Sequence, residues 1–284
     1  MDNCFTPVPI PSRHRQHDVA QKVRWYSWSC ASVRLIEKNL NRILALPRPG
    51  CISVRGCDPY SSSYSYRFSA LPVPLADFSL EMADALLRTR AGRDMKFFAG
   101  MLDPPVSSLV LHKCFALIRA GVARIYGDGR AALHAPVQTR RVDDGFPLHS
   151  DLFLTDRLLL IFDDVSKGNS GKALFLSRES FDAAVKCNPQ MPFVTRKKLR
   201  GLWRGPVRKD SFDESFNTIY SSDDPWAASL VHTMNKNCWQ IKLHRGEGYL
   251  LNDRQWLHGR TPVNGRVSEA RFRRLVYGPI AAHR

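Results

Sequence analysis

Two stretches in the first half of the chain have apolar residues that recur with helical spacing. Residues 78–90 carry them three and four positions apart, which predicts a helix. A second helix is expected to start at Pro104-Pro105, because proline suits a first helical turn, and to run to about Ala120. Its apolar positions form one stripe that we expect to face the core: Val106, Leu109, Val110, Cys114, Leu117 and Ile118.

After residue 122 the pattern changes to short apolar runs separated by Gly, Asn and Asp, which is typical of strands. The expected strands are 158–162, 173–176, 239–243, 249–251 and 272–277. Helices followed by many short strands favour an α+β fold with a β-sandwich or barrel core. No internal repeat or sharp linker is visible, so residues 21–284 are expected to form a single domain. Residues 1–20, with three prolines and a basic cluster, are expected to form a loose arm.

One long segment, residues 187–226, interrupts the strands and is rich in proline and glycine. Within it, seven basic residues occur with no acidic residue between them: Arg196, Lys197, Lys198, Arg200, Arg204, Arg208 and Lys209. A long insertion between core strands often forms a lid or a binding loop, whereas a run of charge is often only a solvated surface. The sequence leaves both interpretations open.

Composition narrows the class of protein without choosing a function. The 284 residues are 44% hydrophobic and 24% charged, as in ordinary globular proteins. The N-terminal residues have no apolar segment typical of a secretory signal, and no run of eighteen apolar residues predicts a membrane span. The seven cysteines are scattered without C-x-x-C spacing, so we expect reduced thiols in the cytoplasm.

The formal net charge of +16 predicts an attraction to anions, which include nucleic acid, acidic proteins and carboxylate substrates. No zinc-finger, RNP or basic-zipper pattern is present, which weakens a nucleic-acid interpretation without excluding it.

The first candidate for chemistry is the pair His149 and Asp151. On a strand, residues two apart point to the same face, so one imidazole nitrogen and one carboxylate oxygen can bind a single cation. A third ligand from elsewhere in the chain would complete a facial triad, the arrangement that holds iron(II) and leaves open coordination positions. Taken alone, H-x-D is a weak motif because nine histidines make a chance occurrence common.

The second motif spans residues 246–263, which read GEGYLLNDRQWLHGRTPV. This segment resembles the signature G-D-x-x-x-x-D/N-N-x-R-x-x-H-G-R-x-x-F of the taurine dioxygenase and clavaminate synthase-like family of iron(II)/2-oxoglutarate-dependent oxygenases. The resemblance implies a double-stranded β-helix (jelly-roll) core flanked by helices. It also implies that His258 is the third metal ligand, with Fe(II), 2-oxoglutarate and O2 as cofactors and co-substrates. The carboxylate of Asp151 favours oxygen transfer or desaturation over halogenation, since related halogenases lack it.

The family also has an arginine on the last core strand that binds the distal carboxylate of 2-oxoglutarate. Arg271, thirteen residues after His258, is the first choice, and Arg273 shares its strand face. Arg274 is expected to point the other way. The sequence departs from the family pattern at three positions: Ala173 replaces a threonine that helps to bind 2-oxoglutarate, Glu247 replaces Asp, and Val263 replaces Phe.

The substrate is less constrained. Small carboxylates, amino acids and sulfonates suit the family, and an acidic carrier protein that presents a tethered substrate would suit the basic charge. Candidate substrate-binding residues are Arg196, Lys197, Trp203 and Arg260. Three alternatives stay open: an oxygenase acting on nucleic acid, a non-catalytic jelly-roll binding protein, and a zinc or manganese enzyme that uses the same ligands. Trp239 and Trp256 are expected to belong to the core.

Overall fold

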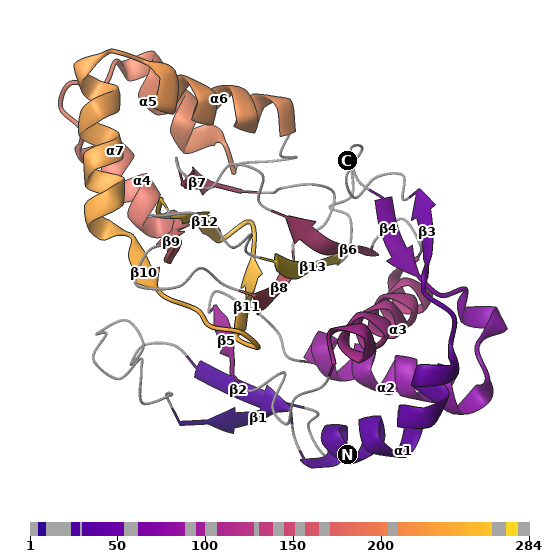
Figure 1. The fold of residues 1–284 in the computed structure, drawn as a ribbon. Coiled ribbons are helices and arrows are strands. Elements are labelled where there is room, and N and C mark those ends of the chain that lie inside the picture. The colour runs from indigo at the N-terminus through magenta and orange to yellow at the C-terminus, as the bar shows by residue number, and fades with distance from the viewer. Residues whose placement is uncertain are drawn as a thin grey trace.

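The structure of the chain is a computed structural model. The structure describes residues 5–9, 24–28, 30–53, 62–88, 95–99, 107–127, 131–138, 145–150, 157–164, 171–203, 209–262 and 271–277. Within these ranges the chain is a mixed α+β structure in which two β-sheets lie between two groups of helices (Figure 1). This confirms the α+β class expected from the order of helical and strand-like patterns.

The larger sheet has the strand order β1-β2-β5-β11-β8-β13-β6. Its neighbouring strands are antiparallel except for β2 and β5, which are parallel. The strands are β1 (Phe5–Val8), β2 (Arg24–Trp28), β5 (Lys96–Phe98), β6 (Ala131–Gln138), β8 (Arg157–Asp164), β11 (Gly248–Asn252) and β13 (Arg271–Tyr277). Because β1 pairs with β2, this part of the expected N-terminal arm belongs to the sheet and is not loose.

The smaller sheet has the order β10-β9-β12-β7, and all its pairs are antiparallel. Its strands are β7 (Phe146–His149), β9 (Ala173–Ser177), β10 (Trp239–Ile241) and β12 (Trp256–Arg260). A separate hairpin consists of β3 (Gly50–Ser53) and β4 (Ser62–Ser65). All five strands expected from the apolar runs are present, with ends shifted by one or two residues.

The two larger sheets pack face to face through aromatic side chains. Phe175 on β9 contacts Phe97 on β5 and Tyr249 on β11, with ring centroids 5.6 and 4.8 Å apart. Trp239 and Trp256 belong to the same cluster, their rings 5.1 Å apart, which confirms their expected place in the core. Burial of these rings removes a large apolar area from water and stabilises the sheet-on-sheet contact.

Helices from the N-terminal half cover the outer face of the larger sheet (Figure 1). They are α1 (Cys30–Ala45), α2 (Val73–Arg88) and α3 (Ser108–Tyr126), with a short 3-10 turn, η3 (Phe68–Ala70), before α2. Lys113 on α3 is buried, and its ammonium donates to the carbonyl oxygens of Leu44 and Leu46 at the end of α1. These bonds satisfy carbonyl groups at the helix end and tie α1 to α3.

The predicted helix at 78–90 is therefore α2, which begins earlier, and the helix predicted from Pro104-Pro105 is α3. Pro104, Pro105 and Val106 lie outside the described residues. The start of α3 is set by Ser107, whose hydroxyl accepts a hydrogen bond from the backbone N–H of Val110. Four of the predicted stripe positions are buried, namely Val110, Cys114, Leu117 and Ile118. Leu109 is 43% exposed, so its assignment to the core face was wrong.

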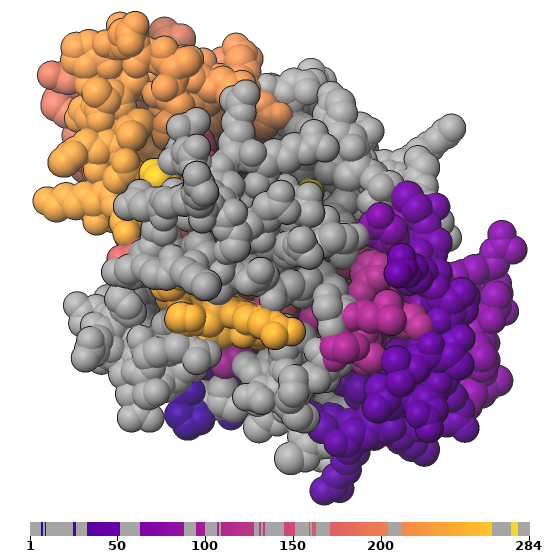
Figure 2. Space-filling view, viewed as in Figure 1, coloured from indigo at the N-terminus to yellow at the C-terminus, as the bar shows by residue number. Residues whose placement is uncertain are grey.

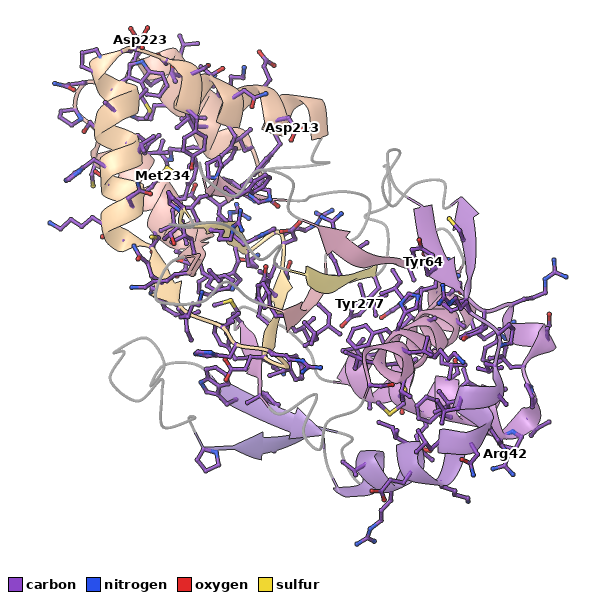
Figure 3. All side chains as sticks on the ribbon, viewed as in Figure 1. Arg42, Tyr64, Asp213, Asp223, Met234 and Tyr277 are labelled. Carbon is purple, nitrogen blue, oxygen red and sulfur yellow. The ribbon has the colours of Figure 1, made fainter. Side chains whose placement is uncertain are left out.

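A second group of helices covers the outer face of the smaller sheet: α4 (Arg178–Cys187), α5 (Phe193–Gly201), α6 (Lys209–Ser221) and α7 (Pro225–Asn237). Figure 2 shows their orange residues gathered at one end of the molecule, with the indigo and magenta residues of α1 to α3 at the opposite end. In Figure 3, Met234 on α7 lies among the helices that cover the smaller sheet. Tyr277 on β13 lies beside α3, one of the helices that cover the larger sheet. Much of the insertion 187–226 is thus helical and packed.

Among the described residues, no helix combines the length and the apolar character needed to cross a membrane.

Candidate active site

Two of the three predicted metal ligands lie directly opposite each other. His149 ends β7, His258 is in the middle of β12, and the two residues are partners in the antiparallel register of these strands. Their ring centroids are 4.3 Å apart. Residues 109 positions apart in the sequence are therefore close enough to share one cation.

Strand alternation places both histidines on the inner face of the smaller sheet. Their neighbours Leu148 and Leu257 are buried in the cluster formed with α4 to α7, on the outer face. His258 is also the register partner of Phe175, whose ring packs between the sheets. Since successive side chains on a strand point to opposite faces, the histidines face the larger sheet.

The imidazole of His149 is oriented by its own strand. Its Nδ1 lies 2.9 Å from the carbonyl oxygen of Pro147, an arrangement in which Nδ1 carries the proton and donates it. Nε2 is then the nitrogen with the lone pair, as a metal ligand requires. The ring of Phe146, half-exposed at 52%, lies edge-on against His149 with a centroid separation of 4.4 Å. The histidine pair is therefore next to solvent on the side of β7.

Gly259, between His258 and Arg260, lets β7 approach β12 closely. A Cβ built at this position would lie 2.7 Å from the carbonyl oxygen of Phe146 and 3.0 Å from the backbone of Pro147. The register between the strands also shifts at this point, between His258 and Arg260. The glycine of the H-G-R motif thus has a steric role, because any larger residue would push the strand of His149 away from that of His258.

A buried carboxylate adds negative charge beside the histidines. Asp253, in the turn before β12, is 3% exposed, and its Oδ1 lies 3.4 Å from Nε2 of His258. The hydroxyl of Ser150 donates to the carbonyl oxygen of Asp253 at 2.8 Å. This bond joins the end of β7 to the turn that precedes β12, so it connects the strands that carry the two histidines.

One positive side chain lies further along the inner face, and the charge of another acts on it. Arg260, two residues after His258, is the register partner of Ala173, which belongs to the cluster between the sheets. Burial lowers the pKa of Arg260. Lys242, which follows β10, is almost completely buried, and burial together with the nearby charge of Arg260 lowers its pKa. Two cations kept close together inside a protein make a favourable environment for an anion.

The last core strand carries the arginines predicted to bind a keto acid. Arg271 and Arg273 are in β13, but their side chains lie outside the described residues. Arg274 is partly buried and is the register partner of Leu160, which in turn is the partner of Tyr249. Register partners share a face, and Tyr249 faces the smaller sheet, with its ring 6.4 Å from that of His258. Arg274 therefore lies on the face of the larger sheet that faces the histidine pair.

The other predicted substrate residues are not brought to the histidines. Trp203 is buried among the outer helices, with its ring against Phe181 and Phe212 at 5.1 Å each. Arg196 on α5 donates from its guanidinium to the carbonyl oxygens of Asn188 and Met191, which fixes the turn before its own helix. Lys197 is exposed on α5 and lines a shallow depression with Phe193 and Arg200. These residues belong to the helical layer on the outer face of the smaller sheet.

Asp151, the predicted carboxylate ligand, lies outside the described residues. In the part of the chain that the structure describes, no three or more His, Cys, Asp or Glu side chains are grouped as a complete metal site. The described donors are two imidazoles with a carboxylate close by, and His149 has its proton directed away from the site. Such donors suit a divalent first-row metal.

Comparison with solved structures identifies the fold. The chain superimposes on asparagine oxygenase (AsnO) with a TM-score of 0.50, over 89% of this chain and 92% of that one, at 12% sequence identity. The protein has the asparagine oxygenase fold. Asparagine oxygenase in complex with Fe(II), 2S,3S-3-hydroxyasparagine and succinate is matched at a TM-score of 0.49, 13% identity and coverages of 88% and 92%.

The non-heme iron oxygenase OrfP, in complex with Fe, succinate and (3S)-hydroxy-L-Arg, is matched over 90% of this chain and 94% of that one, at 13% identity and a TM-score of 0.45. No family model matches the sequence, and no curated protein does. The identities are low, so the asparagine oxygenase fold is what these comparisons show.

Three residues of the site were not predicted from the sequence. Asp253 was visible only as part of the second motif, and Lys242 had no motif at all. Arg274 was expected to point to the opposite face of β13 from Arg271. The order of apolar residues around it could have helped, since Val276, two positions later, belongs to the cluster between the sheets.

Proposed function

We propose that the protein is an iron(II)/2-oxoglutarate-dependent dioxygenase that hydroxylates an unactivated C–H bond of a small, amino-acid-like substrate. The observation that carries this proposal is the register pairing of His149 with His258 on the inner face of a sheet in an asparagine oxygenase fold. In this proposal His149, Asp151 and His258 hold the iron. In the same proposal, the two sheets correspond to the double-stranded β-helix that the sequence resemblance implies.

The iron and its co-substrate would supply the oxidant: substrate, 2-oxoglutarate and O2 give hydroxylated product, succinate and CO2. The residues of the chain bind and orient the reactants. Pro147 holds the His149 ring in the tautomer that offers Nε2, and Gly259 allows the two histidine strands to approach. Phe175 and Tyr249, buried beside His258, keep bulk water from that side of the site.

Among the arginines of the last strand, we propose Arg274 as the one that faces the keto acid. It lies on the same face of the larger sheet as Tyr249, and the guanidinium group can bind a carboxylate through two parallel hydrogen bonds. Arg271 and Arg273 are the arginines that the family resemblance favours from their distance to His258. The register pairs Arg273 with Ile161, whose side chain packs in the cluster formed with α1 to α3.

The substrate class follows from two observations. The protein whose fold this chain shares acts, by its name, on asparagine. The described part of the inner face also carries Arg260, and its positive charge, with that of Lys242 near it, suits the carboxylate groups of small acids. A carrier-bound substrate stays within the proposal, since α5 exposes Phe193 and Val194 beside Lys197 and has no acidic residue of its own.

The proposal is tested by adding Fe(II) and then 2-oxoglutarate to the metal-free protein without oxygen, and recording the visible charge-transfer absorption. Succinate release is then measured in air with a panel of the common amino acids. We expect the absorption band with the native protein and neither the band nor succinate with His149→Ala or Asp151→Ala. His232→Ala, at an exposed position on α7, is the matched control and should behave as the native protein. Native-like absorption and turnover in both site variants would overturn the proposal.

A further inference from the structure

Phe146, the first residue of β7, is brought to the inner face of the smaller sheet by an irregularity in the strand pairing. From His149 to Phe146, β7 advances three residues, whereas the partner strand β12 advances only two. An extra residue in one strand is a β-bulge, which re-aims the side chains beyond it. Without the bulge, alternation would place Phe146 on the opposite face from His149. With it, Phe146 shares the face of its register partner Arg260, and its ring lies edge-on against His149.

The backbone on both sides defines the position of Phe146. Gly145 has a φ of 72°, and a Cβ built there would lie 2.8 Å from the carbonyl oxygen of Arg260. The chain therefore enters β7 in direct contact with the end of β12. After Phe146, the carbonyl oxygen of Pro147 accepts a hydrogen bond from Nδ1 of His149. The ring of Phe146 thus extends from backbone that is closely packed on one side and hydrogen-bonded on the other.

Phe146 differs in exposure from the other described aromatic residues at the histidine pair. Phe175 is completely buried and Tyr249 is 5% exposed, so these rings have almost no surface left for a ligand. Phe146 is 52% exposed, although its ring contacts a proposed metal ligand. A half-exposed ring in this position gains burial when a molecule with an apolar part binds beside it.

We infer that Phe146 contacts the substrate and gives the site a preference for amino acids with an apolar side chain. The inference rests on the proposed function, in which a C–H bond must lie next to the metal held by the two histidines. A hydrocarbon side chain that packs on the Phe146 ring has its C–H bonds close to His149. An amide or charged side chain in the same place loses hydrogen bonds to water, and the ring offers none in return.

The test compares amino acids that match in shape and differ in polarity. Leucine and asparagine have side chains with the same number and branching of non-hydrogen atoms, and so do valine and threonine. Each is titrated, without oxygen, into the protein loaded with Fe(II) and 2-oxoglutarate, and its dissociation constant is obtained from the change in the charge-transfer absorption. The native protein should bind the apolar member of each pair more tightly. In Phe146→Ala the dissociation constant of that member should rise by about tenfold, as expected when part of a ring is no longer buried, while that of the polar member stays within about twofold.

Further variants separate a contact with the substrate from support of the metal site. Phe146→Leu keeps an apolar side chain and should retain most of the preference. Phe146→Gln has a polar side chain and should lose the preference; it replaces Phe146→Ala if that variant does not fold. Phe193→Ala removes an exposed ring from α5, on the outer face, and should leave every constant unchanged. The affinity for Fe(II) should stay near the native value in all Phe146 variants.

The outcomes distinguish this inference from the proposed function. If the native protein gives no absorption with Fe(II) and 2-oxoglutarate, the proposed function itself fails. If it gives the absorption but prefers the polar member of each pair, or binds neither member, only the role of Phe146 is overturned. Equal weakening of both members in Phe146→Ala, together with a loss of Fe(II) affinity, would mean that the ring only supports His149. An unchanged preference in Phe146→Ala would likewise overturn the inference.

Discussion

His149 and His258 are partners in the antiparallel register of β7 and β12, and Gly259 is the residue that allows their strands to meet so closely. The short contacts of a Cβ at position 259 would be with backbone atoms of Phe146 and Pro147, which cannot rotate away as a side chain can. The geometry of the proposed metal site thus depends on a residue that would donate nothing to the metal.

We therefore predict that Gly259→Ala weakens metal binding although both histidines are kept. The added methyl group must displace β7 from β12, which moves His149 relative to His258, and overpacking of this kind costs about 1–3 kcal/mol of folding free energy. Fe(II) or Co(II) affinity, measured by competition with a chelator, should fall at least tenfold. The control is Gly201→Ala on α5, where a Cβ meets nothing within 4 Å. Native metal affinity in Gly259→Ala would mean that β7 is not held in place by this contact.

The buried carboxylate of Asp253 gives a second prediction. Its Oδ1 lies 3.4 Å from Nε2 of His258, so it adds negative charge beside the metal position and orients the imidazole. Asp253→Asn keeps the size and removes the charge. We expect metal affinity to fall by roughly tenfold to a hundredfold, the usual effect of losing such an outer carboxylate.

Thermal unfolding of the metal-free protein serves as the control for Asp253. Removing a buried carboxylate should leave the metal-free midpoint unchanged or raise it, because the cost of burying the charge is also removed. A lower midpoint combined with unchanged metal affinity would assign Asp253 a purely structural role.

The sequence was sufficient to predict that His149 and His258 come together and insufficient for the residues around them. H-x-D and H-G-R fix residue types and spacing, and two ligands on strands need only alternation to share a face. The α+β class also followed from patterns along the chain, because each apolar run reports its own strand. Alternation does not tell which residues of β13 face the smaller sheet. That depends on how β13 pairs with β8, and the paired residues are more than a hundred positions apart in the sequence.

The helical insertion shows a different limit. Residues 187–226 contain several Pro and Gly residues and a basic run, and the sequence pattern gave no clear helix there. In the structure their apolar residues, among them Leu199, Phe212 and Trp226, pack against the outer face of the smaller sheet. The helices are stabilised by this tertiary contact more than by local propensity, so the pattern of the segment alone could not reveal them.

Arg196 and Lys197 are neighbours in the basic run, and the structure predicts different effects for them. Arg196 donates to the carbonyl oxygens of Asn188 and Met191, at 2.6 and 3.2 Å, whereas Lys197 is exposed. Arg196→Met should therefore lower the free energy of unfolding by about 1–2 kcal/mol, and Lys197→Met should change it by less than about 0.5 kcal/mol. Urea denaturation of both variants checks this.

Lys197→Met also tests a role of the basic run in substrate binding. If the basic run attracts the substrate, Lys197→Met should raise KM at low salt while the maximal rate is kept, and added salt should remove the difference. An unchanged KM would leave α5 as a solvated surface.

Tyr220 on α6 connects the outer helices to the active site. Its hydroxyl donates to the carbonyl oxygen of Leu148 at 3.1 Å, next to His149. Tyr220→Phe removes this bond and little else, so we expect a loss of about 1 kcal/mol in unfolding free energy and a small loss of metal affinity. Thr218→Val, which removes a hydroxyl bonded within the same helix, is the control that should not affect metal binding. Equal metal affinities in the two variants would show that α6 does not help to hold β7.

The last prediction concerns which arginine of β13 faces the histidine pair. Arg274 shares a face with Tyr249, and Tyr249 faces His258, so the guanidinium of Arg274 is on the side where a metal-bound keto acid would lie. Arg274→Gln should raise the dissociation constant of 2-oxoglutarate by roughly tenfold to a hundredfold in the Fe(II)-loaded protein without oxygen. Arg273→Gln, one position earlier and paired with Ile161, should change it by less than about twofold. The reverse result, with Arg273 or Arg271 as the sensitive position, would mean that the arginine favoured by the family resemblance binds the keto acid and that the register of β13 with β8 does not determine which arginine reaches the ligand.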